Sequence, residues 1–183
     1  MNSKVTHINV GNLAENCWFL ANEDTKEAVV IDPGAEPDRI CAAAEKHGWK
    51  ITAILLTHGH IDHMGACESL RTELGVKVYA LTEEEDLLLD AKKNLSVFIE
   101  RKVVTFEPDE LLRDGQELTL AGMKIQVIHT PGHTPGGCSY YVADAGCVFS
   151  GDTLFAESVG RSDFPGGSTS ALVRAVKEKL FLL

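Results

Sequence analysis

Hydrophobic positions in the first part of the chain fall into three short runs separated by turn residues. The runs VTHINV (5–10), NCWFLAN (16–22) and EAVVID (27–32) are rich in β-branched and aromatic residues, which favour strands. Glycine, asparagine and proline lie between and after these runs, as is typical of tight turns. The pattern predicts three opening strands.

The middle of the chain alternates between helical and extended patterns. Gly48 and Gly75 follow two of the helical segments, and a glycine in this place commonly ends a helix. In order, the pattern predicts a helix at 37–47, a strand at 51–57, a helix at 65–74, a strand at 76–81 and an acidic helix at 83–93. Such alternation is typical of parallel strands joined by helices.

Beyond residue 103 the pattern changes to short apolar runs separated by glycine turns, which predicts antiparallel hairpins. The expected strands are 117–120, 123–129, 138–142 and 147–150. An amphipathic helix is expected at 168–180, with Ser168 and Thr169 available as its N-cap. Parallel crossovers need helices on both faces of a sheet, and hairpins can close a second sheet. We therefore predict an α/β fold with two sheets.

The composition favours one domain with a sizeable core. The chain has 183 residues, of which 44% are hydrophobic and 24% charged, so we expect a single domain over 1–183. A formal charge of -10 argues against a nucleic-acid partner. Five cysteines without a C-x-x-C pair predict a reduced, cytoplasmic compartment. With neither a signal-peptide pattern nor eighteen consecutive apolar residues, we expect no membrane partner.

Four metal-competent side chains gather in the run THGHIDHMG (57–65), directly after an apolar run. His58 and His60 alternate on an extended stretch and can therefore point to one side. Asp62 and His63 follow as the chain turns. A cluster of this density can address two metal ions.

Two later segments carry further candidates. His133 lies in a glycine-proline turn after a predicted strand, where a side chain can be aimed at a site, so we expect it to be a ligand. His129 continues the strand and is better explained as a packed histidine. Asp152 follows a strand and a glycine. Its two oxygens can bridge two cations, although an aspartate in this place is often only a turn or cap.

The segments THGHIDH (57–63), HTPGHTPG (129–136) and SGDTLF (150–155), in this order, resemble the metallo-β-lactamase superfamily of metallohydrolases. The early IDPG (31–34) resembles the first motif of that superfamily, so the match spans most of the chain. The resemblance implies an αβ/βα sandwich of two mixed sheets flanked by helices.

The resemblance also implies a set of ligands for two metal ions. Three of them, His58, His60 and His133, would bind one ion. Asp62 and His63 would bind the other ion, and Asp152 would bridge the two. Asp32 would support the metal loop by contacting a ligand rather than an ion. Histidine and carboxylate ligands suit two zinc ions per chain, with iron or manganese as alternatives.

Further residues indicate a branch of the superfamily. An aspartate at the bridging position speaks against true β-lactamases, and residues 151–167 are similar to the small, single-domain branch of glyoxalase II-like hydroxyacylglutathione hydrolases. By this resemblance Tyr140 and Arg161 contact the substrate, and Asp163 supports the site. The alternative for Tyr140 is a half-buried aromatic of the sheet. The alternative for Arg161 is an ion pair with Asp163.

The reaction implied by the resemblance is hydrolysis of a small thioester, such as the glutathione derivative S-lactoylglutathione, by a hydroxide that two cations generate from water. Asp62 would orient the water and receive its proton, unless it is only a helix N-cap. A second interpretation retains His58, His60 and His133 as a mononuclear iron site of a persulfide dioxygenase. A third is a truncated, impaired metal-binding or interaction module.

The chain departs from the superfamily pattern at its C-terminal end. Members carry one more histidine after the last strand, whereas this chain ends at Leu183 with no histidine beyond His133. We therefore expect a shortened fold that lacks the last strand and helix, and an incomplete second metal site. An open edge of the core can pair with another chain, so a monomer or a homodimer is expected.

Overall fold

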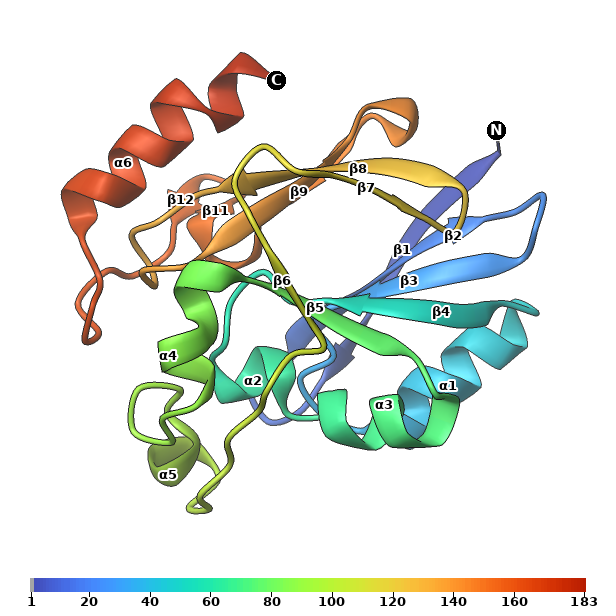
Figure 1. Cartoon of the computed structure of the whole chain (residues 1–183), viewed down its shortest axis with the longest axis horizontal. Helices are drawn as coiled ribbons and strands as arrows, with labels where there is room; N and C mark the ends of the chain where they lie inside the picture. The colour runs from blue at the N-terminus through green and yellow to red at the C-terminus, as the bar shows by residue number, and fades with distance from the viewer. Residues whose placement is uncertain (1) are drawn as a thin grey trace.

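Two β-sheets face each other, and helices cover their outer sides (Figure 1). The computed structural model describes residues 2–183. In Figure 1, α1 (Pro37–Lys46), α2 (Ile61–Met64) and α3 (Cys67–Leu74) lie beneath one sheet, and α6 (Thr169–Glu178) lies beyond the other. The predicted α/β architecture is confirmed. The single domain and the missing last strand and helix stay predictions.

The first sheet is mixed, and its six strands follow one another in sequence order. The first three strands pair antiparallel, and the third to the sixth run parallel. The alternation of helices and strands in the middle of the chain predicts the parallel part. The strands are β1 (Ser3–Val10), β2 (Glu15–Asn22), β3 (Glu27–Ile31), β4 (Lys50–Leu55), β5 (Lys77–Leu81) and β6 (Glu110–Leu112). The last of these was not predicted, because three residues are too few to show a period.

The second sheet has four strands in the order β10-β9-β8-β7. They are β7 (Glu117–Leu120), β8 (Met123–His129), β9 (Cys138–Val142) and β10 (Cys147–Phe149). All three pairings are antiparallel. The second predicted sheet is thus antiparallel rather than mixed, because short connections reverse the chain after each strand. A small hairpin of β11 (Leu154–Phe155) and β12 (Ser158–Val159) follows.

The predicted acidic helix at 83–93 is shorter than expected. A 3-10 turn at Thr82–Glu84 leads into α4 (Glu85–Leu88), and a separate short helix, α5 (Ser96–Ile99), follows outside the predicted range. The side chain of Asp90 accepts hydrogen bonds from the backbone N–H groups of Lys92 (2.9 Å) and Lys93 (3.3 Å). An aspartate that bonds the backbone in this way offers the chain a turn in place of a helix. The helix therefore ends before residue 90.

The C-terminal helix begins where the sequence predicts it. The Ser168 hydroxyl accepts a hydrogen bond from the backbone N–H of Ala171 at 3.3 Å, and this bond caps α6. The helix extends only to Glu178. Within residues 2–183, no helix has both the length and the apolar character needed to cross a membrane.

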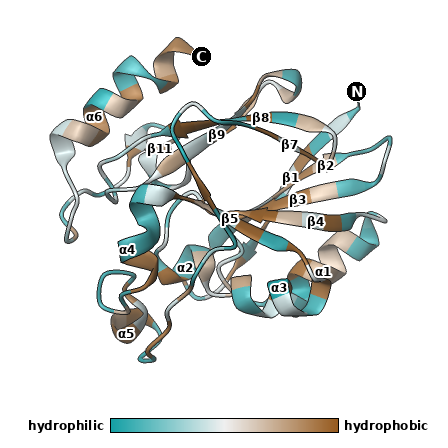
Figure 2. Ribbon diagram, in the orientation of Figure 1, coloured by the Kyte–Doolittle hydropathy of each residue, from teal (hydrophilic) through white to brown (hydrophobic). Residues whose placement is uncertain are grey.

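Alternate residues of the central strands fill two separate cores. On β3, Val29 and Ile31 belong to the core between the sheets, whereas Ala28 and Val30 belong to the core beneath the helices. All four side chains are fully buried. Figure 2 shows apolar residues along the strands of both sheets. Burial on both faces anchors the strands, so the loops that leave their ends start from fixed positions.

Candidate metal centre

The predicted ligands gather where strands of both sheets end. His58 and His60 lie in the loop after β4, and His63 follows on α2. His133 lies in the loop between β8 and β9, and Asp152 lies in the turn after β10. Segments far apart in the sequence therefore meet in one cluster. Loops anchored by buried strands hold functional side chains in place.

Three imidazoles form the first group. Ligand-capable atoms of His58, His60 and His133 lie within 4.8 Å of one another, and the residues are 3%, 3% and 4% exposed. Burial and the neighbouring histidines lower the pKa of His60 to about 3 and hold the pKa of His58 well below its usual range. Both rings are therefore neutral, which is the form of histidine that binds metal ions.

The second group combines one imidazole with carboxylates. Ligand-capable atoms of His63, Asp62 and Glu15 lie within 4.8 Å of one another. The Nε2 atom of His63 is 3.3 Å from Glu15 Oε2 and 3.8 Å from Asp62 Oδ2. Burial raises the pKa of Glu15 to about 7. Sequence reasoning missed Glu15, because a lone glutamate at the start of a strand carries no motif.

Asp152 lies between the two groups. Its Oδ1 is 3.3 Å from His63 Nε2, and its Oδ2 is 3.5 Å from His133 Nε2. Burial works to raise the pKa of Asp152, but the neighbouring histidines lower it below its usual range. One oxygen of an ionised carboxylate thus faces each group, as a bridging ligand requires.

Two buried histidine nitrogens without hydrogen-bond partners among residues 2–183 indicate whether these residues fit metal ions. The Nε2 atoms of His58 and His63 are buried and have no hydrogen-bond partner within the described part of the chain. Buried polar atoms in proteins are nearly always paired. Each group therefore holds a buried imidazole nitrogen that a cation can satisfy, and the donor set fits a pair of metal ions.

Asp32 supports the second group from behind. Its Oδ2 accepts a hydrogen bond from His63 Nδ1 at 3.0 Å, which leaves Nε2 of that ring as the ligand atom. The same carboxylate accepts from the Thr57 backbone N–H (2.7 Å) and hydroxyl (2.6 Å). Burial works to lower the pKa of His63, but the Asp32 and Asp152 carboxylates raise it well above its usual range.

The backbone of Arg161 supports the first group. His133 Nδ1 donates to the Arg161 carbonyl at 2.7 Å. The Arg161 guanidinium pairs with both oxygens of Asp163 at 2.7 Å, and these two side chains are 60% and 68% exposed. The alternative of an ion pair between Arg161 and Asp163 is thus present, and the predicted support of the site by Asp163 stays a prediction. The substrate contact of Arg161 stays a prediction.

Tyr140 lies in the core between the sheets. It has no exposed surface, and its hydroxyl donates to the Leu56 carbonyl at 2.7 Å. A fully buried side chain offers no surface to a ligand. The structure therefore favours the sheet-aromatic alternative, in a fully buried form, over the predicted substrate contact.

Asp62 and His129 each had two interpretations. His60, not Asp62, is the N-cap residue of α2, and its side chain makes no capping hydrogen bond within the described residues. The alternative of Asp62 as a helix cap is therefore not supported. His129 Nε2 donates to the Pro135 carbonyl at 2.8 Å, and His129 lies outside both ligand groups. This position agrees with a structural histidine.

Glu84 clamps together the two loops that carry the first group. Its Oε1 accepts from the Gly59 backbone N–H, and its Oε2 accepts from the Gly136 N–H, both at 2.8 Å. Glu84 is 1% exposed, and burial raises its pKa to about 7. A Cβ at Gly59 would lie 2.7 Å from a Leu88 methyl group, and a Cβ at Gly136 would overlap the Glu84 backbone. Both glycines allow the clamp to close.

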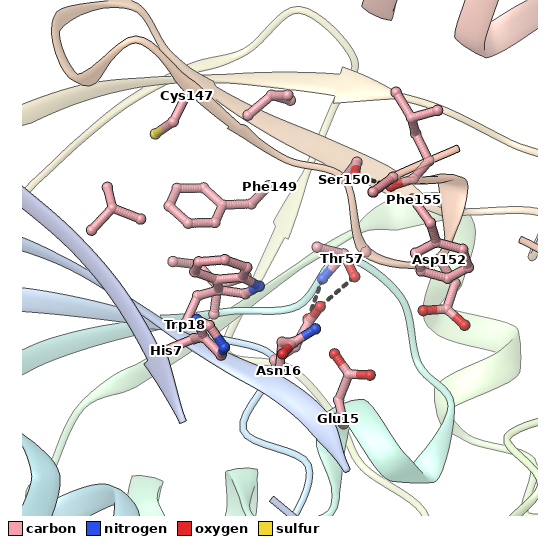
Figure 3. Close-up of a pocket in the computed structure, with 17 residues that line it drawn as sticks. His7, Glu15, Asn16, Trp18, Thr57, Cys147, Phe149, Ser150, Asp152 and Phe155 are labelled. Carbon is pink, nitrogen blue, oxygen red and sulfur yellow. Dashed lines mark hydrogen bonds between the residues drawn. The ribbon is translucent and has the colours of Figure 1, made fainter. Parts of the chain in front are cut away.

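A pocket of about 480 Å³ opens beside the second group. Trp18 and Phe149 line its apolar part, whereas Glu15 and Asp152 point toward its other end (Figure 3). A substrate that reaches the ligand groups from this side can place an apolar portion against the aromatic rings.

The family model of the metallo-beta-lactamase superfamily matches residues 10–182. The chain belongs to this superfamily. Its members are metal-dependent hydrolases, and the resemblance inferred from the three motifs is confirmed.

Two curated relatives cover nearly the whole chain. The "Probable metallo-hydrolase YqgX" of Bacillus subtilis is 38% identical over 175 residues, which are 95% of this chain and 82% of that protein. The hydroxyacylglutathione hydrolase GloC of Haemophilus influenzae is 34% identical over 171 residues, which are 92% of this chain and 80% of that protein.

Solved structures of the superfamily share the fold. BLEG-1, described as a B3 metallo-beta-lactamase, has a TM-score of 0.92 at 36% identity, and the match covers 98% of this chain and 87% of that one. TTHA1623 in a di-iron-bound form has a TM-score of 0.84 at 35% identity, covering 97% and 87%. These neighbours differ in name, and one of them is described with two irons, so the likeness alone does not identify the substrate or the metal of this chain.

Proposed function

We propose that this chain is a hydrolase that uses two divalent cations to cleave a small thioester, such as S-lactoylglutathione. The observation that carries the proposal is the pair of ligand groups on either side of Asp152. Each group has a buried histidine nitrogen for which the described residues supply no hydrogen-bond partner. The ligands would be His58, His60 and His133 for one cation, Asp62 and His63 for the other, and Asp152 for both.

Such cations, when bound, supply Lewis acidity that polarises a carbonyl group and makes water a nucleophile near neutral pH. Asp62 is the residue that we expect to handle the proton. Its carboxylate is 21% exposed and faces the second group, so it can orient a water molecule and accept its proton.

Zinc is the metal we expect in both positions, because imidazole and carboxylate ligands suit it. Iron and manganese accept the same ligands, and TTHA1623 has been solved with two irons. The metal should therefore be identified in protein that is purified without added metal ions.

The similarity to GloC supports a thioester as substrate. A β-lactam is a second candidate, which the likeness to BLEG-1 favours. The aspartate at position 152 argues for the thioester, because the resemblance associates this residue with glyoxalase II-like hydrolases.

The test begins with elemental analysis of protein purified without added metal. Turnover of S-lactoylglutathione, of a chromogenic cephalosporin and of glutathione persulfide with oxygen uptake is then compared. We expect two zinc ions per chain and thioester turnover that a chelator abolishes and zinc restores. Faster β-lactam turnover would favour the second candidate. One iron with oxygen uptake would indicate the dioxygenase, and metal without turnover would indicate a binding module.

A further inference from the structure

We propose that Glu15 is a ligand of the second cation position, where it joins Asp62 and His63 around a divalent cation that accepts carboxylate and imidazole ligands. This inference rests on the proposed function only in assuming that the second position binds a metal ion. It adds a ligand from a part of the chain that none of the sequence motifs includes.

The position of Glu15 is the first argument. Its Oε2 lies 3.3 Å from the Nε2 atom of His63, which is buried and finds no hydrogen-bond partner among residues 2–183. Ligand-capable atoms of Glu15, Asp62 and His63 lie within 4.8 Å of one another. In Figure 3 the carboxylate of Glu15 points toward the space that the carboxylate of Asp152 also faces. A small cation in this space is within reach of all four side chains.

The anchoring of Glu15 is the second argument. Glu15 is the first residue of β2, and it pairs with Val10 of β1. Its side chain is only 19% exposed. A backbone held in a sheet positions a ligand more firmly than a free loop does. Glu15 is therefore presented to the second group by a fixed element, as the loop histidines are by β4.

Local charge is the third argument. Four carboxylates surround the ring of His63 at 3.0 to 3.8 Å: those of Glu15, Asp32, Asp62 and Asp152. One imidazolium cannot balance four partly buried carboxylates, and gathering uncompensated charges of one sign is costly. A divalent cation relieves this repulsion and uses the carboxylates as ligands.

The number of ligands leaves room for Glu15. A catalytic zinc site usually has three protein ligands and a water molecule, and it can expand to five ligands. The first position has three histidines and Asp152. Without Glu15 the second position has Asp62, His63 and the shared Asp152, whereas with Glu15 it also reaches four.

The test is a zinc titration of the metal-free 183-residue chain against a chelator of known affinity, for the wild type and Glu15→Gln. We expect the wild type to bind two zinc ions. The substitution should weaken the second equivalent by more than about 10-fold and leave the first unchanged, because losing a ligand costs more than losing the partner of a ligand. Cobalt titration adds a spectroscopic readout, since the absorption spectrum of the second equivalent should change.

Glu27→Gln is the matched control. Glu27 begins β3 as Glu15 begins β2, is also partly buried, and pairs with Asn22 at the opposite end of the sheet. It should bind both equivalents as the wild type does. Glu15→Ala is a second variant, in case an amide beside His63 impairs folding, and circular dichroism of the metal-free proteins checks that each is folded.

Two results would overturn the inference: unchanged binding of both equivalents by folded Glu15 variants, or binding of only one zinc by the wild type. Neither result depends on turnover. Conversely, if the wild type and the variants differ in the second equivalent but none cleaves a thioester, the proposed reaction fails and the assignment of Glu15 stands.

Discussion

The two halves of the metal centre are built in opposite ways. The first half uses three histidines that are at most 4% exposed. The second half sets one buried imidazole among carboxylates, of which Glu15 and Asp62 are 19% and 21% exposed. Neutral rings can be packed together before a cation arrives, whereas clustered carboxylates repel one another until it does. The first half is therefore a preformed site, whereas the charges of the second are balanced only when a cation is bound.

The supports behind the two halves also differ. Behind the first half, Glu84 bonds two backbone N–H groups, and the Arg161 carbonyl accepts from His133. Behind the second half, Asp32 bonds the ring of His63 directly and adds to the negative charge around it. A carboxylate therefore supports each half, but that of Glu84 bonds the backbone of the ligand loops, whereas that of Asp32 bonds the ring of a candidate ligand.

Removing a ligand of the preformed half should have the largest effect. His133→Ala deletes one of three imidazoles and the only one that comes from the loop after β8. We expect the affinity for the first zinc and the thioester turnover to fall by more than about 100-fold, beyond the range seen for loss of a supporting residue. Chelator competition and steady-state kinetics measure the two effects. His47→Ala, an exposed histidine stacked on Trp49, is the control and should change neither.

Removing the clamp should have the next largest effect, and it should be confined to the first half. Glu84→Ala leaves the N–H groups of Gly59 and Gly136 without their acceptor. We expect about 10- to 100-fold weaker binding of the first zinc and a loss of about 1–3 kcal/mol in the free energy of unfolding. Zinc titration and urea unfolding measure these changes.

The neighbouring Glu83→Ala removes an exposed carboxylate from the same segment and serves as the control. An equal loss of both zinc equivalents in Glu84→Ala would show that the clamp serves the whole centre. The distinction between the two halves would then be lost.

The candidate ligands could be picked out because they lie in short runs, and Glu84 could not because its contacts depend on the fold. His58 and His60 are two residues apart, so their spacing alone suggests a shared site. Glu84 lies in an acidic run that looks like a solvated helix face, and its partners Gly59 and Gly136 are 25 and 52 residues away. Only the fold, which places the 3-10 turn and α4 against these two loops, brings the groups together.

Tyr140 shows how the direction of a side chain on a strand escaped prediction. On β9, Tyr140 is buried and Tyr141 is partly exposed. Alternation along the strand predicts that the two face opposite sides, but the sequence does not indicate which side carries the metal centre. The order of elements was predicted because their hydrophobic periods are long. The two-residue strands β11 and β12 were missed because they have no period.

The pH dependence of zinc binding should also differ between the two halves, by a smaller factor than the effect of His133→Ala. A metal ion binds only the deprotonated ligand, so a ligand whose pKa is raised competes with protons below that pKa. The pKa of His63 is raised well above its usual range and that of Glu15 to about 7, whereas that of His60 is lowered to about 3. Between pH 7 and 6 we expect the second zinc to bind about 10-fold more weakly per proton displaced. The first zinc should bind with little change.

Calorimetry in buffers of different ionisation enthalpy counts the protons released with each equivalent. The second zinc should release more protons than the first at pH 6. If both equivalents weaken in parallel as the pH falls, the difference in charge between the halves does not govern binding.

The smallest effect should come from substituting Tyr140. The substitution tests whether this residue belongs to the metal centre or only to the core. Tyr140→Phe keeps the ring between the sheets and removes only the hydroxyl that donates to Leu56. We expect a loss of about 1 kcal/mol in the free energy of unfolding, the usual worth of one hydrogen bond, with no change in KM for the thioester. Urea unfolding and steady-state kinetics measure both. A raised KM without a loss of stability would restore the substrate contact that the resemblance implied, and the second half would then extend into β9.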